Sequence, residues 1–232
     1  MRLEYPLEYA KNLTHDATSI LKGLRLARKY NDFTMIGPSV YAGNIALLQY
    51  AKDVTGCVVE CGVWRGGMSA GMADVLGAGR RYYLFDSYEG MPPAQDEDGE
   101  VARAWEAATD SPVYYDNCKA EVDFAKRAMG MSVAEDVTYV QGWFSETVKD
   151  FVAPGGIAVL RLDGDWYEST MTCLRALYPQ VVPGGLIIID DYFAWDGCAK
   201  AVNEYFASTD PPERIRSAHR VSHILKGTND PR

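Results

Sequence analysis

From Cys57 onward, short apolar runs alternate with segments of helical pattern, and this alternation constrains the fold more than any other feature. Apolar runs that lack strict polar alternation and are separated by helical segments are typical of parallel strands buried between helices. The sequence therefore predicts an α/β fold with a doubly wound, Rossmann-like, mostly parallel sheet. Near the end of the chain, RIRSAHR and VSHILK are expected to add an antiparallel edge. The expected parallel strands lie in CVVEC, RYYLFD, DVTYV, IAVLRLD and GLIIIDD.

The residues before the first strand predict an N-terminal helical extension. Apolar side chains recur at helical intervals over 7–29, and the start signal Gly37-Pro38-Ser39 predicts a second helix over about 40–52. No repeat or low-complexity linker divides the 232 residues. We therefore expect a single domain overall, with a helical cap over 1–55 and a Rossmann-like unit over 56–232.

Charge and composition exclude several classes of function. The chain has 23 basic and 32 acidic residues and a net charge of −9, which repels phosphate backbones, so a nucleic acid partner is not expected. No apolar run approaches the ~20 residues of a membrane span, and the first residues lack the apolar segment of a secretory signal. We expect a cytoplasmic protein without a membrane partner. The five cysteines include no CxxC pair and are expected to be free thiols.

The first strand is followed by a glycine-rich turn in VVECGVWRGGMS. Glu60 is expected at the strand end, Gly62 in the tight turn, and Ser69 at the start of the next helix. The spacing E-x-G-x-x-x-G-G departs from the GxGxxG of nicotinamide-dependent oxidoreductases. An acid at this point suits a cationic ligand such as S-adenosylmethionine. The alternative interpretation is an ordinary glycine-rich turn.

Acidic residues also follow three later strands. Asp86 is placed to accept hydrogen bonds from a ribose, or else to cap a turn. Asp163 and Asp165 follow one strand, and Asp190 and Asp191 follow the next. If these strands are neighbours, the carboxylates converge and require a counter-charge. An all-oxygen donor set suits Mg²⁺, whereas helix capping by Asp165 or Asp191 is the structural alternative.

Two further groups of residues have no assigned chemistry. Residues 88–112 are strongly acidic and show little structural pattern, so we expect a disordered insertion or a lid that orders over a substrate. The histidines His15, His219 and His223 lie outside every motif and are interpreted as surface or packing residues, although His15 could reach an acceptor from the N-terminal helix.

These motifs resemble the magnesium-dependent, S-adenosylmethionine-dependent sugar O-methyltransferases of the TylF (macrocin) family. The resemblance covers most of the chain from about Cys57 to Phe206. More distantly, the layout is similar to catechol-type O-methyltransferases, whose metal-binding acids are spaced like Asp163 and Asp190, 27 residues apart. The strings that carry the resemblance are VVECGVWRGGMS, FDSYEGMP, QGWFSETV, AVLRLDGDWYESTMTCLRALYP, VPGGLIIIDDY and GCAKAVNEYF.

The resemblance implies a role for each matching residue. It implies Mg²⁺ ligands at Asp163, Asp190 and Asp191. Trp166 occupies the place of the catechol-type lysine base, so Asp165 or Asp163 becomes the expected base. The implied cofactor contacts are Glu60, Gly62, Trp64 and Ser69 at the methionine end, Asp86 at the ribose, and Gly142 and Trp143 near the adenine. Met35 is expected to cover the bound cofactor, and Arg65, Ser87 and Asp163 are expected as additional contacts.

The predicted function is transfer of a methyl group from S-adenosylmethionine to a sugar hydroxyl of a glycosylated natural product, with S-adenosylhomocysteine as product. The resemblance also leads us to expect a homo-oligomer, most simply a dimer. Three alternatives stay open: a methyltransferase for a vicinal phenol, a nicotinamide-dependent oxidoreductase, and a cofactor-binding module without catalysis.

Overall fold

A seven-stranded sheet forms the centre of the computed structural model. The structure describes the backbone of residues 4–210 and 212–227, and in these ranges it describes the side chains from residue 17 onward. The strand order is β3-β2-β1-β4-β5-β7-β6. The first five strands in this order are parallel, and β7 and β6 form the antiparallel edge, as predicted. The strands are β1 (Cys57–Cys61), β2 (Arg81–Asp86), β3 (Asp136–Gln141), β4 (Ile157–Leu162), β5 (Val181–Ile189), β6 (Arg216–Ala218) and β7 (Val221–Leu225).

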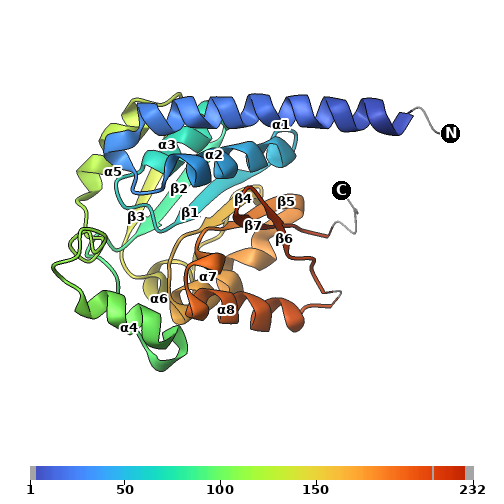
Figure 1. The fold of residues 1–232 in the computed structure, drawn as a ribbon. Coiled ribbons are helices and arrows are strands. Elements are labelled where there is room, and N and C mark those ends of the chain that lie inside the picture. Colours follow the sequence, from blue (N-terminus) through green and yellow to red (C-terminus); the bar gives the residue numbers. More distant parts are fainter. Residues whose placement is uncertain (1–3, 211, 228–232) are drawn as a thin grey trace.

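Helices cover both faces of this sheet (Figure 1). Among the described residues, α1, α2, α3 and α5 pack on one face and α6, α7 and α8 on the other. The helices are α1 (Glu4–Lys29), α2 (Pro38–Leu47), α3 (Gly67–Leu76), α4 (Gly99–Ala107), α5 (Val122–Gly130), α6 (Phe144–Thr147), α7 (Tyr167–Leu177) and α8 (Asp196–Ala207), with 3-10 turns η1 (Asn31–Phe33), η2 (Leu48–Ala51), η3 (Asp96–Asp98), η4 (Tyr178–Gln180) and η5 (Asp191–Phe193).

The central strands are apolar because both of their faces are buried. Every residue of β1 and of β4 is buried. Alternate side chains enter the two cores: Val58 packs with the N-terminal helices, and Val59 packs with α7 and α8. This is the arrangement that the unbroken apolar runs predict.

The N-terminal extension shares the core of the sheet domain. Tyr30 of the segment after α1 and Tyr41 and Ile45 of α2 are buried in the same cluster as Val58 of β1 and Leu186 of β5. The helix predicted over about 40–52 is α2 followed by η2. The N-terminal half of α1 extends beyond the rest of the domain (Figure 1). None of the described helices is both long and apolar enough to cross a bilayer.

The hairpin between β6 and β7 closes through His219 and Arg220, whose φ angles are +53° and +67°. Two successive left-handed residues match the twist of a two-residue hairpin turn. His223 of β7 is buried and stacks on Tyr50, so it is a packing residue as expected. The side chain of His15 lies outside the described residues.

The prediction of little structure over residues 88–112 is wrong. This stretch contains η3 and the nine-residue helix α4. Asp98 is buried and accepts hydrogen bonds from the backbone N–H of Gln95 (2.8 Å) and of Tyr167 (2.7 Å), which begins α7. The segment is thereby attached to the sheet domain, although its local sequence pattern is weak.

Candidate functional site

A cavity of about 1000 Å³ lies beyond the carboxyl ends of β1, β2, β4 and β5. The strand order reverses between β1 and β4, and ligands of doubly wound sheets bind at this point. The cavity is lined by Glu60, Gly62 and Asp86 from the ends of β1 and β2 and by Asp163 and Asp191 from the ends of β4 and β5. The two groups of acids predicted from separate motifs therefore share one cavity.

The glycine-rich loop after β1 packs directly against the end of β4. Gly62 has a φ of +88°, and a Cβ at this position would lie 1.7 Å from the carbonyl oxygen of Asp163. Asp86 fixes the same loop, because one of its oxygens accepts from the N–H of Val63 (2.7 Å) and of Trp64 (2.8 Å). Its other oxygen accepts from the N–H of Tyr88 (2.6 Å). Asp86 thus caps the loop and also lines the cavity.

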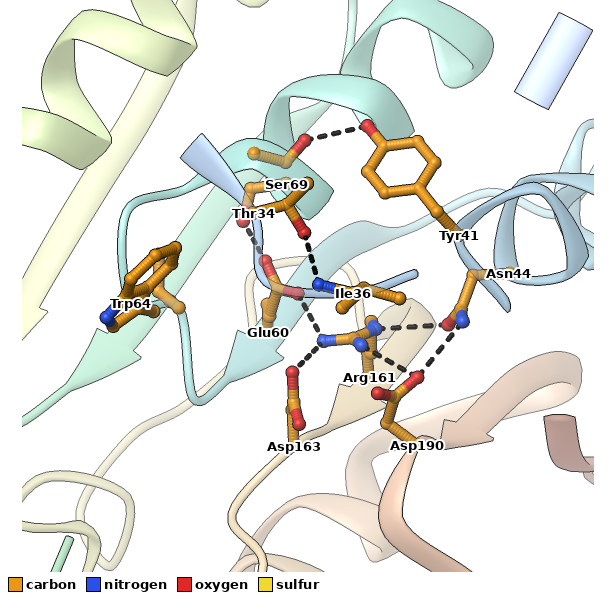
Figure 2. Close-up of polar contacts among 12 residues, drawn as sticks. Thr34, Ile36, Tyr41, Asn44, Glu60, Trp64, Ser69, Arg161, Asp163 and Asp190 are labelled. Atoms are coloured by element: carbon orange, nitrogen blue, oxygen red, sulfur yellow. Dashed lines mark hydrogen bonds and ion pairs between the residues drawn. The ribbon is translucent and has the colours of Figure 1, made fainter. Parts of the chain in front are cut away.

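Glu60 is the buried acid at the end of β1, with 1% of its surface exposed. It accepts a hydrogen bond from the Ser69 hydroxyl at the start of α3 and pairs with Arg161 at 2.8 Å (Figure 2). Burial raises the pKa of Glu60 to about 7, although the Arg161 guanidinium opposes this rise. Ser69 supports Glu60 from behind and does not itself line the cavity.

Arg161 is a central residue of the site that the sequence analysis did not single out. It lies in β4 with none of its surface exposed, and its guanidinium contacts carboxylates from three strand ends: Glu60, Asp163 at 2.7 Å and Asp190 at 2.8 Å (Figure 2). Burial alone would lower the pKa of Arg161, but the surrounding carboxylates raise it overall. The available signal was the charge inside the apolar run IAVLRLD, because a buried arginine requires anionic partners.

The acids after β4 and β5 converge as the strand order requires. Carboxylate oxygens of Asp163, Asp165 and Asp191 lie within 4.8 Å of one another. Burial raises the pKa of all three, and the neighbouring carboxylates raise it further. The pKa of Asp165 rises to about 7 even though Trp195 donates an indole N–H to it at 2.8 Å. Asp165 also has a left-handed φ of +57°, and such strain in a non-glycine residue is often found at functional sites.

Asp190 lines the same cavity and shares Arg161 with Asp163 as a partner. It pairs with Arg161 and accepts a hydrogen bond from the Asn44 amide of α2 at 3.0 Å. Among the described residues, the compact group of possible metal ligands therefore contains Asp165 in addition to the predicted Asp163 and Asp191, and it does not include the predicted Asp190.

The other predicted cofactor residues divide into two sets. Arg65 is not among the residues that line the cavity, and its guanidinium stacks over the rings of Trp64 (4.4 Å) and Phe124 (4.6 Å). The residues that line the cavity are Met35, Trp64, Ser87, Gly142 and Trp143.

An aromatic cluster holds the segment after β2 beside the acids. Trp105 of α4 contacts Trp166 and Trp195 edge-on, with ring centroids 6.1 Å apart in both pairs. Trp166 and Trp195 also contact each other at 5.1 Å. The indole of Trp166 donates to the carbonyl of Pro92 at 2.8 Å. This packing accompanies a stretch whose residues line the cavity wall, namely Gly90, Met91, Pro92, Pro93, Gln95 and Asp98.

Comparison with known proteins assigns the family. The model of the macrocin O-methyltransferase (TylF) family matches residues 31–221. The chain belongs to the macrocin O-methyltransferase family.

Curated relatives support this family assignment. A tetracenomycin 4′-O-methyltransferase of Streptomyces olivaceus, which acts on a dimethoxy-rhamnosyl derivative, is 38% identical over 71% of this chain. Demethyldecarbamoylnovobiocin O-methyltransferase of Streptomyces niveus is 36% identical over 73% of this chain. The alignments cover 64% and 65% of those two relatives, so the chain matches less than two-thirds of their length.

Solved structures share the fold of this family member. The O-methyltransferase NovP superposes with a TM-score of 0.65 and 31% identity, over 83% of this chain and 81% of NovP. The calicheamicin methyltransferase CalS11 superposes with a TM-score of 0.61 and 20% identity, over 90% of this chain and 92% of CalS11, which supports the Rossmann-like fold alone.

Proposed function

We propose that this member of the macrocin O-methyltransferase family transfers a methyl group from S-adenosylmethionine to a hydroxyl of a sugar moiety on a glycosylated natural product, with help from Mg²⁺. The observation that carries the proposal is the single cavity that joins Glu60 and the glycine-rich loop to the acids after β4 and β5. The relative named for a dimethoxy-rhamnosyl tetracenomycin derivative supports the class of acceptor.

The residues around the glycine-rich loop fit S-adenosylmethionine. Glu60 offers a buried carboxylate to a cationic ligand, and Gly62 lets the backbone pass close to the end of β4. The indole nitrogen of Trp64 is buried without a hydrogen-bond partner in the described part of the chain, so it can donate to a ligand. When bound, S-adenosylmethionine supplies an electrophilic methyl group on its sulfonium. We assign Asp86 and Ser87 as contacts of the ribose, Gly142 and Trp143 as contacts of the adenine, and Met35 as the residue that covers the bound cofactor.

The acids after β4 and β5 fit a hard divalent cation. Their donor atoms are carboxylate oxygens alone, which Mg²⁺ prefers over the nitrogen and sulfur ligands typical of zinc sites. We assign Asp163, Asp190 and Asp191 as the residues that would hold Mg²⁺, with Asp165 beside them. When bound, Mg²⁺ lowers the pKa of an oxygen ligand, which makes a hydroxyl a better nucleophile at neutral pH.

The chain itself positions the acceptor and receives its proton. Asp165 or Asp163 accepts the proton of the attacking hydroxyl, and Trp195 holds the Asp165 carboxylate through its indole N–H. The segment packed on Trp166 and Trp195 lines the cavity together with these acids, and we expect it to limit the access of water when substrates are bound. Orientation of the hydroxyl in line with the methyl group then provides the main rate gain.

A methyl-transfer assay tests the proposal. The protein is incubated with S-adenosylmethionine labelled in the methyl group and with a panel of rhamnosylated natural products, other glycosylated natural products and simple catechols, each with Mg²⁺ or EDTA. We expect labelled product from a glycosylated acceptor with Mg²⁺ and none with EDTA. Transfer to catechols alone would replace the acceptor class with vicinal phenols, and equal transfer in EDTA would refute the role of Mg²⁺.

A variant of Asp190 separates the metal from the cofactor. Asp190→Asn keeps the shape of the side chain but removes its charge, so we expect loss of methyl transfer while S-adenosylhomocysteine still binds. Calorimetric titration measures the affinity of the variant for S-adenosylhomocysteine. Wild-type turnover in Asp190→Asn would contradict the assignment of this residue. A dimeric state and a cytoplasmic location are also part of the proposal, and size-exclusion chromatography with light scattering tests the dimer.

A further inference from the structure

We propose that Arg161 and Asn44 are positioning residues that lock the cofactor end and the metal end of the cavity into one rigid unit. The inference rests on the proposed function, since it concerns the same cavity. It adds two residues that do not themselves serve as ligands, and it gives the N-terminal extension a part in the site.

The guanidinium nitrogens of Arg161 contact four side chains (Figure 2). One terminal nitrogen contacts both Glu60 (2.8 Å) and Asp163 (2.7 Å), and the other pairs with Asp190 (2.8 Å). Its Nε donates to the Asn44 side-chain oxygen at 3.1 Å. A planar, permanently charged fork fixes the directions of its partners, which a flexible lysine ammonium cannot do.

Asn44 completes the arrangement from α2. Its oxygen accepts from Arg161, while its amide nitrogen donates to Asp190 at 3.0 Å and to the backbone carbonyl of Val40 at 3.1 Å. Asn44 has none of its surface exposed. Because it both orients the arginine and holds one of its carboxylate partners, it fixes Arg161 and Asp190 relative to each other.

The charges explain why this unit is needed. Three carboxylates from the ends of β1, β4 and β5 meet here, and they would repel one another without a counter-charge. Arg161 supplies that charge within the fold and uses one oxygen of Glu60, one of Asp163 and one of Asp190. The carboxylates are therefore held in place before a cation or cofactor arrives.

A matched pair of variants on α2 tests the role of Asn44. Asn44→Ala removes the contacts to Arg161 and Asp190, whereas Tyr41→Phe removes a buried hydrogen bond from the same helix to the carbonyl of Gly67 (2.8 Å) and does not touch Arg161. Both variants lose buried hydrogen bonds, so thermal unfolding reports their structural cost. Binding of Mn²⁺, followed by electron paramagnetic resonance, reports the positioning role separately.

We expect Asn44→Ala to bind Mn²⁺ about 10–100-fold more weakly than Tyr41→Phe, the usual effect of removing a residue that orients a metal ligand. Its affinity for S-adenosylhomocysteine, measured by calorimetry, should match that of Tyr41→Phe, because Asn44 does not contact Glu60. Arg161→Lys should bind both Mn²⁺ and S-adenosylhomocysteine more weakly, because it loses the planar guanidinium that joins Glu60 to Asp163. If Arg161→Lys does not fold, the Asn44 pair still decides the question.

Equal Mn²⁺ affinities of Asn44→Ala and Tyr41→Phe would overturn the inference. If the wild-type protein binds both Mn²⁺ and S-adenosylhomocysteine in that case, the proposed function stands and only the positioning role fails. If the wild-type protein binds neither ligand, the proposed function fails and this inference fails with it.

Discussion

Gly62 is the position where the fold leaves the least room for a side chain. Its φ of +88° is left-handed, and an added Cβ would meet the backbone oxygen of Asp163 at 1.7 Å. That oxygen cannot move easily, because the backbone N–H of Asp163 is bonded to the carbonyl of Cys61 at 2.8 Å. Gly62→Ala therefore pushes the ends of β1 and β4 apart, at a point where both Gly62 and Asp163 line the cavity.

The cost of Gly62→Ala has two parts that a control can separate. A left-handed alanine costs roughly 1–2 kcal/mol, and forcing an extra methyl group into a packed region adds about 1–3 kcal/mol. Gly155→Ala provides the control, because Gly155 has a φ of +78° and no atom within 4 Å of an added Cβ. Only the backbone cost applies there.

Thermal and urea unfolding measure the difference between these two variants. Gly62→Ala should unfold at a lower temperature than Gly155→Ala by about 2–12 °C, from roughly 2–4 °C per kcal/mol for a chain of this size. It should also lose affinity for S-adenosylhomocysteine, which Gly155→Ala should retain. Equal unfolding temperatures and equal affinities would refute the argument that the close approach of Gly62 to β4 shapes the site.

Two further predictions concern the segment after β2. Trp105→Ala removes aromatic contacts worth about 0.5–1.5 kcal/mol each, so we expect about tenfold faster proteolysis within residues 88–119 and lower turnover; Val101→Ala on the same helix, 62% exposed, is the control, and equal cleavage rates would contradict the prediction. Asp98→Ala removes the bonds to Gln95 and the start of α7 and should lower the free energy of unfolding by about 0.5–2 kcal/mol in urea titrations. Asp96→Ala, with a side chain 98% exposed, should leave that free energy nearly unchanged, and equal losses in the two variants would show that the bonds of Asp98 to Gln95 and Tyr167 do not stabilise the fold.

The sheet and the convergence of the acids were predictable because both follow from local patterns. Buried parallel strands need unbroken apolar runs, and a residue after such a run must lie at the carboxyl edge of the sheet. The adjacency of Asp163 and Asp190 required only that β4 and β5 be neighbours, and they pair in parallel. The glycine-rich turn was equally visible, since Gly62 needs a left-handed backbone.

Most contacts of Arg161 could not be predicted, because three of its four partners, Asn44, Glu60 and Asp190, come from distant parts of the chain. The sequence shows a single charge in an apolar run and does not show where its counter-charges lie. The regular structure of residues 96–107 could not be predicted for a similar reason. Ala102 is the one residue of helix α4 that is buried. Trp105 of this helix packs on Trp166 and Trp195, which lie far from it in the sequence. Tertiary contacts of this kind leave no periodic signal.

The proposed function rests most directly on the cofactor, and thermal unfolding with added ligands tests it. The protein is heated alone and with S-adenosylmethionine, S-adenosylhomocysteine or NAD, each with Mg²⁺ or EDTA. A ligand at ~100 times its Kd stabilises the folded state by roughly 2.7 kcal/mol, which corresponds to a rise of about 5–11 °C here. We predict this rise with the two methionine-derived ligands and none with NAD. A rise with NAD alone would contradict the assignment of Glu60 and the glycine-rich loop, and with it the proposed methyl transfer.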